Sequence, residues 1–284
     1  MELRRSAKSA ALGWVARSSS PEPDVLSSAA LRAMKVRLGR GLAEGYAGGS
    51  RAAACVSVDF DVTMPTRYEA NRAGTRSLLD ISEKHGVPLT WAVCGRTAEE
   101  DPAAYESILK SSVKQEVGVH TYSHIYATET PEGAFEEDIR RCLSVLGMAS
   151  APRTFIFPKN REGHFGLLKR LGFSCYRGKS RAIAAPTRDE GLWNMMPVYY
   201  VDQKSLGAES LIRRFIDACI SRSAVFHLWT HPWSLAIDGS PSAMASSTLE
   251  PVFSYLKQKA EAGMLSISTM GDISDFLDAR GPAR

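Results

Sequence analysis

From residue 53 onward, short apolar runs alternate with segments of helical length and pattern, and this alternation restricts the fold more than any other feature. Strands that alternate with helices form parallel sheets through right-handed crossovers. The strand-like runs are AACVSVDF, VPLTWAVC, EVGVH, RTFIFP, FSCYRG, NMMPVYYV, AVFHLWTH and MLSISTM. With seven or eight such units and no glycine-rich phosphate loop after the first run, the pattern predicts an α/β barrel and not an open dinucleotide-binding sheet.

The composition suits one such barrel in a reducing compartment. The chain has 284 residues, of which 44% are hydrophobic, enough for one sizeable core. Its five cysteines include no CxxC pair, which is typical of reduced thiols and argues against a zinc site built from cysteine. The basic N-terminus is a poor signal peptide because Gly13 and Arg17 break its apolar run, and no stretch of about 18 apolar residues occurs. We therefore expect a soluble, cytoplasmic protein.

The positive charge is concentrated at the N-terminus. Residues 1–50 hold 8 Lys and Arg against 4 Asp and Glu, and the rest of the chain holds 27 against 27. Residues 51–284 therefore carry no net charge, which argues against a nucleic-acid partner, because binding to phosphates requires an excess of Lys and Arg. Within residues 25–43, leucine and methionine recur at helical spacing between basic residues, which predicts a basic amphipathic helix that either packs on the main domain or lies on a membrane surface. We divide the chain into an N-terminal basic helical segment, 1–50, and a main domain, 51–284.

Two aspartates break the first apolar run near its C-terminal end, which reads SVDFDV. Asp59 and Asp61 are two residues apart, so on a strand their side chains point to the same face. Such residues are either turn and capping residues or part of an active site. An active site is possible because the catalytic groups of parallel barrels lie at the C-terminal ends of the strands.

Two histidines follow the third apolar run, in EVGVHTYSH. His120 would end a strand and His124 would lie one helical turn later, a spacing that lets two imidazoles bind one ion. The alternative is that both histidines form local hydrogen bonds. Together with one carboxylate, however, they make the three-ligand set of a catalytic zinc site, and the second carboxylate is then free to act as a base.

A third strand, AVFHLWTH, also ends in histidine. His231 precedes Pro232 at the C-terminal end of this strand and is a candidate general acid. His227 lies on the same face but roughly 13 Å deeper if the strand is fully extended. We therefore expect His227 to support the core or the site without taking part in the chemistry.

Three of these motifs resemble those of the polysaccharide deacetylase family, the NodB-homology domain of carbohydrate esterase family 4. They are SVDFD, HTYSH and HLWTH, and the resemblance covers residues 53–278. It implies a distorted (β/α)7 barrel of the NodB-homology type that removes an N-acetyl or other small N-acyl group from an amino sugar. It also implies that Asp59 is the general base and His231 the general acid, and that the metal ligands are Asp61, His120 and His124.

The resemblance further implies a cofactor and a substrate class. The cofactor would be one divalent ion, Zn²⁺ above all, with Co²⁺ or Mn²⁺ as alternatives. The substrate would be an N-acyl amino sugar, free, nucleotide-linked or lipid-linked, since no signal sequence directs the chain to wall polymer. The alternative functions are a cyclic amide or imide hydrolase of the same fold and a catalytically inactive glycan-binding domain. The complete set of ligands, acid and base favours the deacetylase.

The chain departs from the family pattern after its fourth apolar run. Many relatives carry Arg-Pro-Pro-Tyr-Gly there, with an arginine that steadies the base, whereas this chain has FIFPKNREG with Ile156 in place of the arginine. We therefore expect Lys159 or Arg161 to be the basic partner of Asp59. For the group that orients His231, the nearest candidate is Trp193, together with Asp189.

Overall fold

The computed structural model describes residues 26–62, 64–148, 152–237, 240–241 and 245–280. The central sheet contains β2 (Ala52–Phe60), β3 (Leu89–Val93), β4 (Gln115–Val119), β5 (Thr154–Ile156), β6 (Cys175–Arg177), β8 (Thr187–Asp189), β9 (Leu192–Asn194), β10 (Tyr199–Val201), β11 (Val225–Thr230) and β14 (Leu265–Ile267). The longer helices are α3 (Tyr68–His85), α4 (Gly95–Glu100), α5 (Pro102–Leu109), α6 (Glu132–Val145), α7 (Phe165–Arg170), α8 (Glu209–Ser221), α9 (Glu250–Glu261) and α10 (Met270–Ala279). The shorter elements are α2 (Ser28–Ala33), β1 (Arg37–Leu38), β7 (Ala182–Ile183), β12 (Ala236–Ile237), β13 (Ser240–Pro241), η1 (Ala47–Gly49), η2 (Pro65–Arg67), η3 (Pro158–Asn160), η4 (Gln203–Ser205), η5 (Pro232–Leu235) and η6 (Ala245–Leu249).

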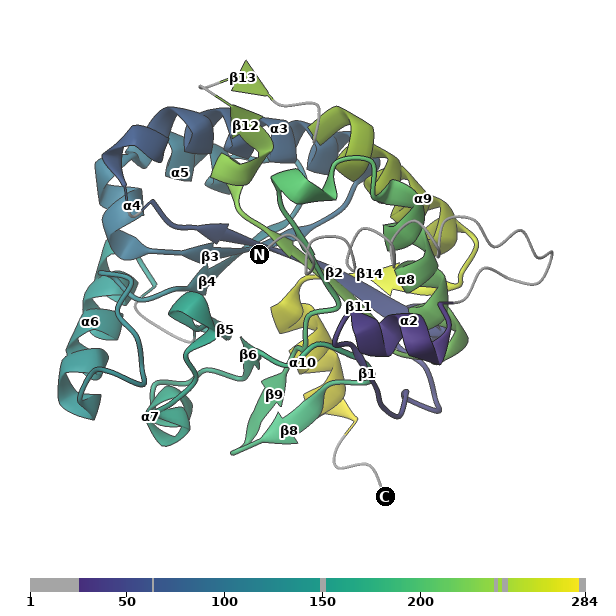
Figure 1. Ribbon diagram of the computed structural model, residues 1–284. Coiled ribbons are helices and arrows are strands. Elements are labelled where there is room, and N and C mark those ends of the chain that lie inside the picture. The colour runs from purple at the N-terminus through teal and green to yellow at the C-terminus, as the bar shows by residue number, and fades with distance from the viewer. Residues whose placement is uncertain (1–25, 63, 149–151, 238–239, 242–244, 281–284) are drawn as a thin grey trace, which may run out of the picture.

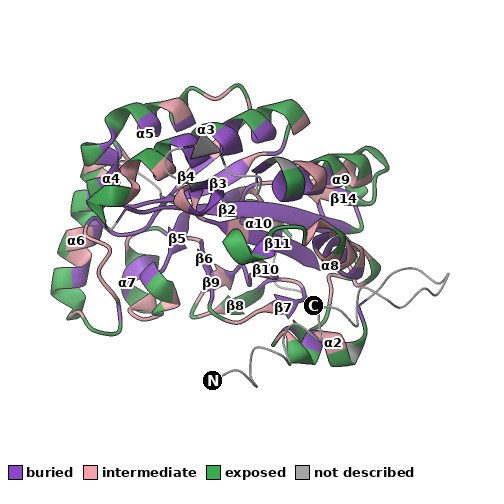
Figure 2. Cartoon of the chain, turned by 45° about the horizontal axis from the view of Figure 1, so that its top comes forward, coloured by how far each residue is buried: buried purple, intermediate pink, exposed green. Residues whose placement is uncertain are grey.

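The sheet is parallel and curled, as the alternation of strands and helices predicted. Its spatial order is β10, β11, β2, β3, β4, β5, β6, β9 and β8, and only the β8–β9 pair is antiparallel. β14 pairs with the start of β2, and β3 pairs with the end of β2. All nine residues of β2 are buried. Most helices lie outside the curl, whereas α10 packs against β2 and β6 within it (Figures 1 and 2).

A short non-strand segment, residues 195–198, links the two sides of the curl. The Met195 N–H donates to the Tyr176 carbonyl at 2.8 Å, and the Val198 N–H donates to the His227 carbonyl at 2.7 Å. The predicted strand NMMPVYYV is therefore wrong as one element, because β9 ends before this segment and β10 begins after it. Pro197 lacks the N–H that a continuous ladder requires. The curled sheet of parallel strands confirms the predicted class, a distorted α/β barrel.

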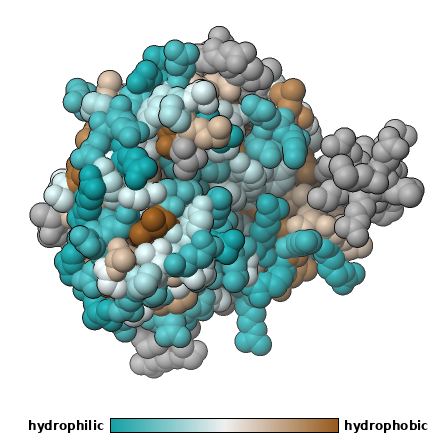
Figure 3. All heavy atoms as spheres, turned by 60° about the vertical axis from the view of Figure 1, so that its left-hand side comes forward, coloured by the Kyte–Doolittle hydropathy of each residue, from teal (hydrophilic) through white to brown (hydrophobic). Residues whose placement is uncertain are grey.

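The outer helices present polar faces to solvent. Figure 3 shows the face formed around α4, α6 and α7, where hydrophilic side chains dominate and large apolar ones are isolated. This pattern is expected for amphipathic helices that bury one stripe against a sheet. Among the helices of the described part of the chain, none combines the length and the apolar character needed to cross a membrane.

The N-terminal helix is shorter than predicted. A helix over 25–43 was expected, but α2 ends at Ala33, and the left-handed backbone of Lys35 (φ 57°) turns the chain into β1. β1 then pairs with β7, and Leu31 is buried in the same core as the sheet. Residues 26–50 are thus packed on the main domain, whereas 1–25 of the predicted N-terminal segment lie outside the described residues. The division of the chain at residue 50 stays a prediction.

A buried glutamate joins three strands to the last helix. The Glu116 carboxylate on β4 accepts hydrogen bonds from Thr90 Oγ1 (2.9 Å), from Thr154 Oγ1 (2.6 Å) and from the Gly271 N–H at the start of α10 (3.0 Å). A negative charge is favourable at a helix N-terminus. A Cβ on Gly271 would lie 2.3 Å from Glu116 Oε1, so only glycine fits at this contact.

Replacing Glu116 by leucine should lower the free energy of unfolding by roughly 2 to 4 kcal/mol, because buried donors lose their acceptor. Urea unfolding of the two proteins measures this difference. The matched control is Glu106→Leu on α5, whose carboxylate is exposed and pairs with Lys110, and which should change stability by less than about 0.5 kcal/mol. Equal unfolding midpoints for the two variants would contradict the role of Glu116.

Candidate active site

The predicted metal ligands lie together at the C-terminal ends of β2 and β4. Asp61 follows β2 and is buried, and His120 directly follows β4 and is also buried. His124 Nε2 lies 3.0 Å from Asp61 Oδ2, and His120 Nε2 lies 3.8 Å from the same oxygen. One ligand atom from each of the three residues lies within 4.8 Å of the others, which is a separation that one ion can bridge.

The hydrogen bonding of His120 fits a metal ligand. Its Nδ1 lies 2.6 Å from the Ile156 carbonyl, which can only accept, so Nδ1 carries the proton. Nε2 is then the unprotonated nitrogen, and it is buried with no hydrogen-bond partner among the described residues. A backbone carbonyl that fixes the tautomer in this way is typical of metal-binding histidines. The residues present therefore fit a divalent ion.

The electrostatics of Asp61 agree with this role. Burial alone would raise the pKa of Asp61, but the neighbouring imidazoles of His120 and His124 outweigh burial and hold this pKa well below its usual range. The carboxylate is thus ionised, as a metal ligand must be.

A left-handed turn, not a helix, brings the two histidines together. We predicted His124 one helical turn after His120, but the chain between β4 and α6 contains no helix, and the rings are 5.0 Å apart because the chain turns at Thr121 (φ 61°) and His124 (φ 60°). Non-glycine residues rarely adopt this conformation, and such strain persists where the surroundings enforce it. Here Asp138 of α6 accepts from the Tyr122 N–H at 2.6 Å and so holds the turn.

The basic partner of Asp59 is Arg177, which the sequence analysis missed. Arg177 ends β6, and its Nη1 and Nη2 donate to the two carboxylate oxygens of Asp59, each at 2.6 Å. The exposed fraction is 1% for the arginine side chain and 4% for the aspartate side chain. Burial by itself would raise the pKa of Asp59, but Arg177 lowers this pKa overall, so the carboxylate is ionised.

The prediction that Lys159 or Arg161 holds Asp59 is therefore wrong. The Lys159 ammonium lies 5.1 Å from the centre of the Tyr126 ring, and Arg161 pairs with Glu129 at 3.2 Å. The sequence did contain a signal for the right residue. Arg177 ends an apolar strand, and this was the feature that singled out the aspartates and histidines.

His231 faces both aspartates from the end of β11. Its Nε2 lies 3.7 Å from Asp59 Oδ2 and 3.8 Å from Asp61 Oδ1. Its other nitrogen, Nδ1, lies 3.1 Å from the Tyr200 hydroxyl, and the Trp233 ring lies 4.5 Å from the imidazole ring. Burial lowers the pKa of His231, although Asp61 and Asp59 act in the opposite direction.

Trp193 does not orient His231, so this prediction is also wrong. The Trp193 indole donates to Asp278 of α10 at 2.9 Å, because β9 lies on the other side of the β6 strand from β5, near α10. The aromatic residues around His231 are instead Tyr200, Trp229 and Trp233.

One stacked column connects Arg177 to His231. The Arg177 guanidinium lies 4.2 Å from the centre of the Trp229 ring, and that ring stacks on Tyr200 at 4.1 Å. Tyr200 in turn contacts His231. Arg177, the partner of Asp59, is therefore connected to His231 through Trp229 and Tyr200.

His227 lies deeper in the barrel, as expected. Its Nδ1 donates to the Met195 carbonyl at 2.8 Å, and Ser57 Oγ lies 2.8 Å from Nε2. Burial, assisted by Arg177, lowers the pKa of His227 to about 3, so this imidazole is neutral near pH 7. It connects β11 to β2 and to the segment that links β9 with β10.

Comparisons with known proteins agree with this site. Residues 48–161, which contain both aspartates of β2 and both histidines after β4, match the family model described as polysaccharide deacetylase. No match was found among curated proteins.

Three solved structures share the fold at low sequence identity. A putative polysaccharide deacetylase from Mycobacterium smegmatis is 16% identical, with a TM-score of 0.64, and the match covers 86% of this chain and 96% of that one. An allantoinase is 14% identical, with a TM-score of 0.62 and coverage of 84% and 94%. A probable polysaccharide deacetylase from Pseudomonas aeruginosa PAO1 is 16% identical, with a TM-score of 0.61 and coverage of 83% and 93%.

The family model supports a hydrolase of the deacetylase type, and the solved structures show the fold. As the SVDFD and HTYSH motifs predicted, residues 48–161 match the polysaccharide deacetylase family model, and this region carries the candidate metal ligands.

Proposed function

We propose that this protein is a metal-dependent hydrolase that removes an N-acetyl or other small N-acyl group from an amino sugar. The observation that carries the proposal is the meeting of two sets of residues at one edge of the barrel. The cluster of Asp61, His120 and His124 can hold a divalent ion, and Asp59 and His231 lie beside it.

A divalent ion held there, with Zn²⁺ the best fit to two imidazoles and a carboxylate, would supply a Lewis acid for the amide carbonyl oxygen. Asp59 is ionised and fixed by Arg177, so it accepts a proton from the attacking water as the C–O bond forms. His231, protonated in the active form, then donates its extra proton to the amide nitrogen as the C–N bond breaks, since an amine anion is a poor leaving group. The products are a carboxylic acid and a free amine.

The position of His231 suits this role. Its Nε2 points between the two aspartates, and its Nδ1 is held by Tyr200. The Trp233 indole lies 3.3 Å from Asp61 Oδ1 and covers one side of the imidazole ring. Both contacts limit rotation of the ring, and a fixed proton donor is a requirement of general acid catalysis.

The first test of the proposal measures metal content and acid release. We expect one divalent ion per chain in purified protein, loss of activity on chelation, and restoration by Zn²⁺ or Co²⁺. His120→Ala should lose both metal and activity. His85→Gln, at the opposite end of the α3 helix from the site, is the matched control and should keep both. A His120→Ala protein that keeps its metal and turns over substrate would overturn the proposal.

The substrate panel for this test contains N-acetyl and N-formyl amino sugars together with allantoin and a cyclic imide. Acetate or formate release from a sugar supports the proposal. Ring opening of the cyclic amides alone would identify a cyclic amide hydrolase of the same fold. A metal-loaded protein that turns over no member of the panel would favour the glycan-binding alternative.

A further inference from the structure

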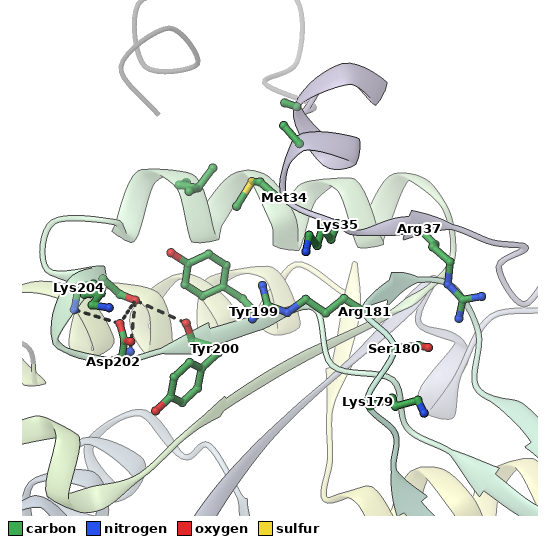
Figure 4. Close-up of a pocket in the computed structure, with 14 residues that line it drawn as sticks. Met34, Lys35, Arg37, Lys179, Ser180, Arg181, Tyr199, Tyr200, Asp202 and Lys204 are labelled. Atoms are coloured by element: carbon green, nitrogen blue, oxygen red, sulfur yellow. Dashed lines mark hydrogen bonds between the residues drawn. The ribbon is translucent and has the colours of Figure 1, made fainter. Parts of the chain in front are cut away.

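A cavity of about 750 Å³ lies beside the candidate active site, between the N-terminal segment and the rim of the barrel. α2 and β1 form its outer wall, and the chain after β6, the strand β10 and the turn η4 form its inner wall (Figure 4). This volume is within the range of small-molecule sites. No residue proposed for catalysis or metal binding lines it.

The lining of this cavity is strongly basic. The charged residues are Lys35, Arg37, Lys179, Arg181 and Lys204, together with one carboxylate, Asp202. Lys35 lines the cavity from its outer wall and Arg181 from its inner wall, and both are cations (Figure 4). Like charges that face each other repel, and an anion between them removes the repulsion.

These cations are not neutralised by carboxylates of the described part of the chain. Among the described residues, no carboxylate forms an ion pair with the side chains of Lys35, Lys179, Arg181 or Lys204. Asp202 is engaged elsewhere, because it caps η4 by accepting from the Lys204 N–H at 3.0 Å. The cavity therefore has a net positive charge.

The cavity is joined to the active site through two residues. Tyr200 lines the cavity and also contacts His231 Nδ1 at 3.1 Å. Lys179, which lines it as well, is two residues after Arg177, the partner of Asp59. A ligand with its anionic part in the cavity must therefore extend past Tyr200 and Lys179 for its acyl group to reach Asp59 and His231.

The chemistry of the lining favours phosphate over carboxylate. Five cations exceed what one carboxylate would neutralise, whereas a phosphate monoester carries a charge of about −1.5 to −2 and a diphosphate presents still more oxygens. Arginine binds phosphate through two parallel N–H donors. The opposite side of the cavity is apolar, formed by Met34, Tyr199 and Leu211, and can contact the group beyond the phosphate.

We propose that this cavity binds the phosphate or diphosphate of the substrate, so that the enzyme acts on a phosphate-linked N-acyl amino sugar. This inference rests on the proposed deacylase function and specifies its substrate class. A sugar phosphate, a nucleoside diphosphate sugar and a polyprenyl phosphate sugar share this chemistry.

The experiment compares four N-acetylglucosamine substrates with the metal-loaded enzyme: the free sugar, its 1-phosphate, its uridine diphosphate derivative and its prenyl diphosphate derivative. A phosphate-linked substrate should have a kcat/KM at least about 100-fold above that of the free sugar, because two or more charge-assisted contacts are added. The substrate with the highest kcat/KM identifies what the phosphate is attached to.

The double variant Lys35→Gln, Arg181→Gln should raise KM for the preferred phosphate-linked substrate about 10-fold to 100-fold and leave kcat nearly unchanged. The free sugar should be hydrolysed as by the wild-type enzyme. The control Lys110→Gln, Lys257→Gln removes two positive charges from exposed positions on α5 and α9 and should not change KM.

Binding of inorganic pyrophosphate, measured by calorimetry, gives a readout that does not need turnover. We expect the wild-type and control proteins to bind it and the double variant to bind at least about 10-fold more weakly. Hydrolysis of the free sugar with no phosphate preference, and equal pyrophosphate binding by all three proteins, would overturn the cavity assignment and leave the deacylase function standing. Failure of every sugar with metal bound would overturn the deacylase function itself.

Discussion

Arg177→Met should lower kcat by roughly 10²-fold to 10³-fold while the protein still binds its metal, because Arg177 positions the base and is not a ligand. In the wild-type protein both guanidinium nitrogens contact Asp59, and neither side chain has appreciable contact with solvent. Without the arginine the carboxylate can rotate away from the water that it must deprotonate. KM should change little, since this contact does not involve the substrate.

Stability provides a second readout for the same variant. Removal of one member of a buried ion pair typically costs about 3 to 5 kcal/mol, because it leaves an uncompensated buried charge. Arg177→Met also exposes one face of Trp229, over which the guanidinium lies at 4.2 Å. Urea unfolding at neutral pH should therefore show a large loss of stability, and kinetics must be measured well below the unfolding temperature.

Arg177→Lys separates positioning from charge. Lysine keeps the positive charge but cannot donate two parallel hydrogen bonds, so kcat should recover only in part. Arg161→Met is the matched control, since Arg161 is 51% exposed and pairs with Glu129, and it should keep wild-type kcat within about 2-fold. If Arg161→Met is the variant that loses activity in a folded, metal-loaded protein, the sequence interpretation was right and the assignment of Arg177 is wrong.

The sequence could predict the parts of the site that depend on strand periodicity. Asp59 and Asp61 point to one face because side chains alternate along a strand, and β2 is a regular strand over all its residues. His120 lies beside them because parallel strands bring their C-terminal ends to one edge of the sheet. These placements need only the type of each element, which the apolar runs indicate.

The parts that could not be predicted depend on backbone irregularity and on long-range order. His124 reaches the site through left-handed residues, which no hydrophobic pattern marks. The choice of Arg177 over Lys159 depends on how β6 and β2 face each other across the curled sheet, and these strands are not neighbours in it. The predicted helix over 25–43 was wrong because helical spacing alone cannot show that β1 finds a partner strand, β7, far along the chain.

A second large loss of activity is expected at the end of β11, which contains His227 and is directly followed by His231. His231→Ala should lower kcat by roughly 10²-fold to 10⁴-fold with metal still bound, because the leaving amine loses its proton donor. The expected reason is geometric: His231 Nε2 lies within 3.8 Å of both aspartates at the mouth of the barrel. Single-turnover kinetics with a measured metal content test this directly.

His227 is the internal control for this assignment. His227→Leu leaves the Ser57 hydroxyl without its acceptor and the Met195 carbonyl without the imidazole donor, at a cost of about 1 to 3 kcal/mol for each buried group. The free energy of unfolding should therefore fall while kcat changes little. His227→Gln, which can still form hydrogen bonds, should recover part of this loss. An active, well-folded His231→Ala protein beside an inactive, well-folded His227→Leu protein would show that the acid is His227.

The pH dependence of stability distinguishes the two histidines without any substrate. Burial lowers the pKa of His227 to about 3 in the folded protein, whereas an imidazole in the unfolded chain titrates near 6.5. Between these values the unfolded state binds the extra proton, so the contribution of His227 is complete above pH 6.5 and is lost progressively as the pH falls toward 3. The wild-type protein should therefore lose more stability between pH 6.5 and pH 4.5 than His227→Gln, which lacks this group. Parallel stability curves for the two proteins over that range would mean that the imidazole is not held neutral in the core.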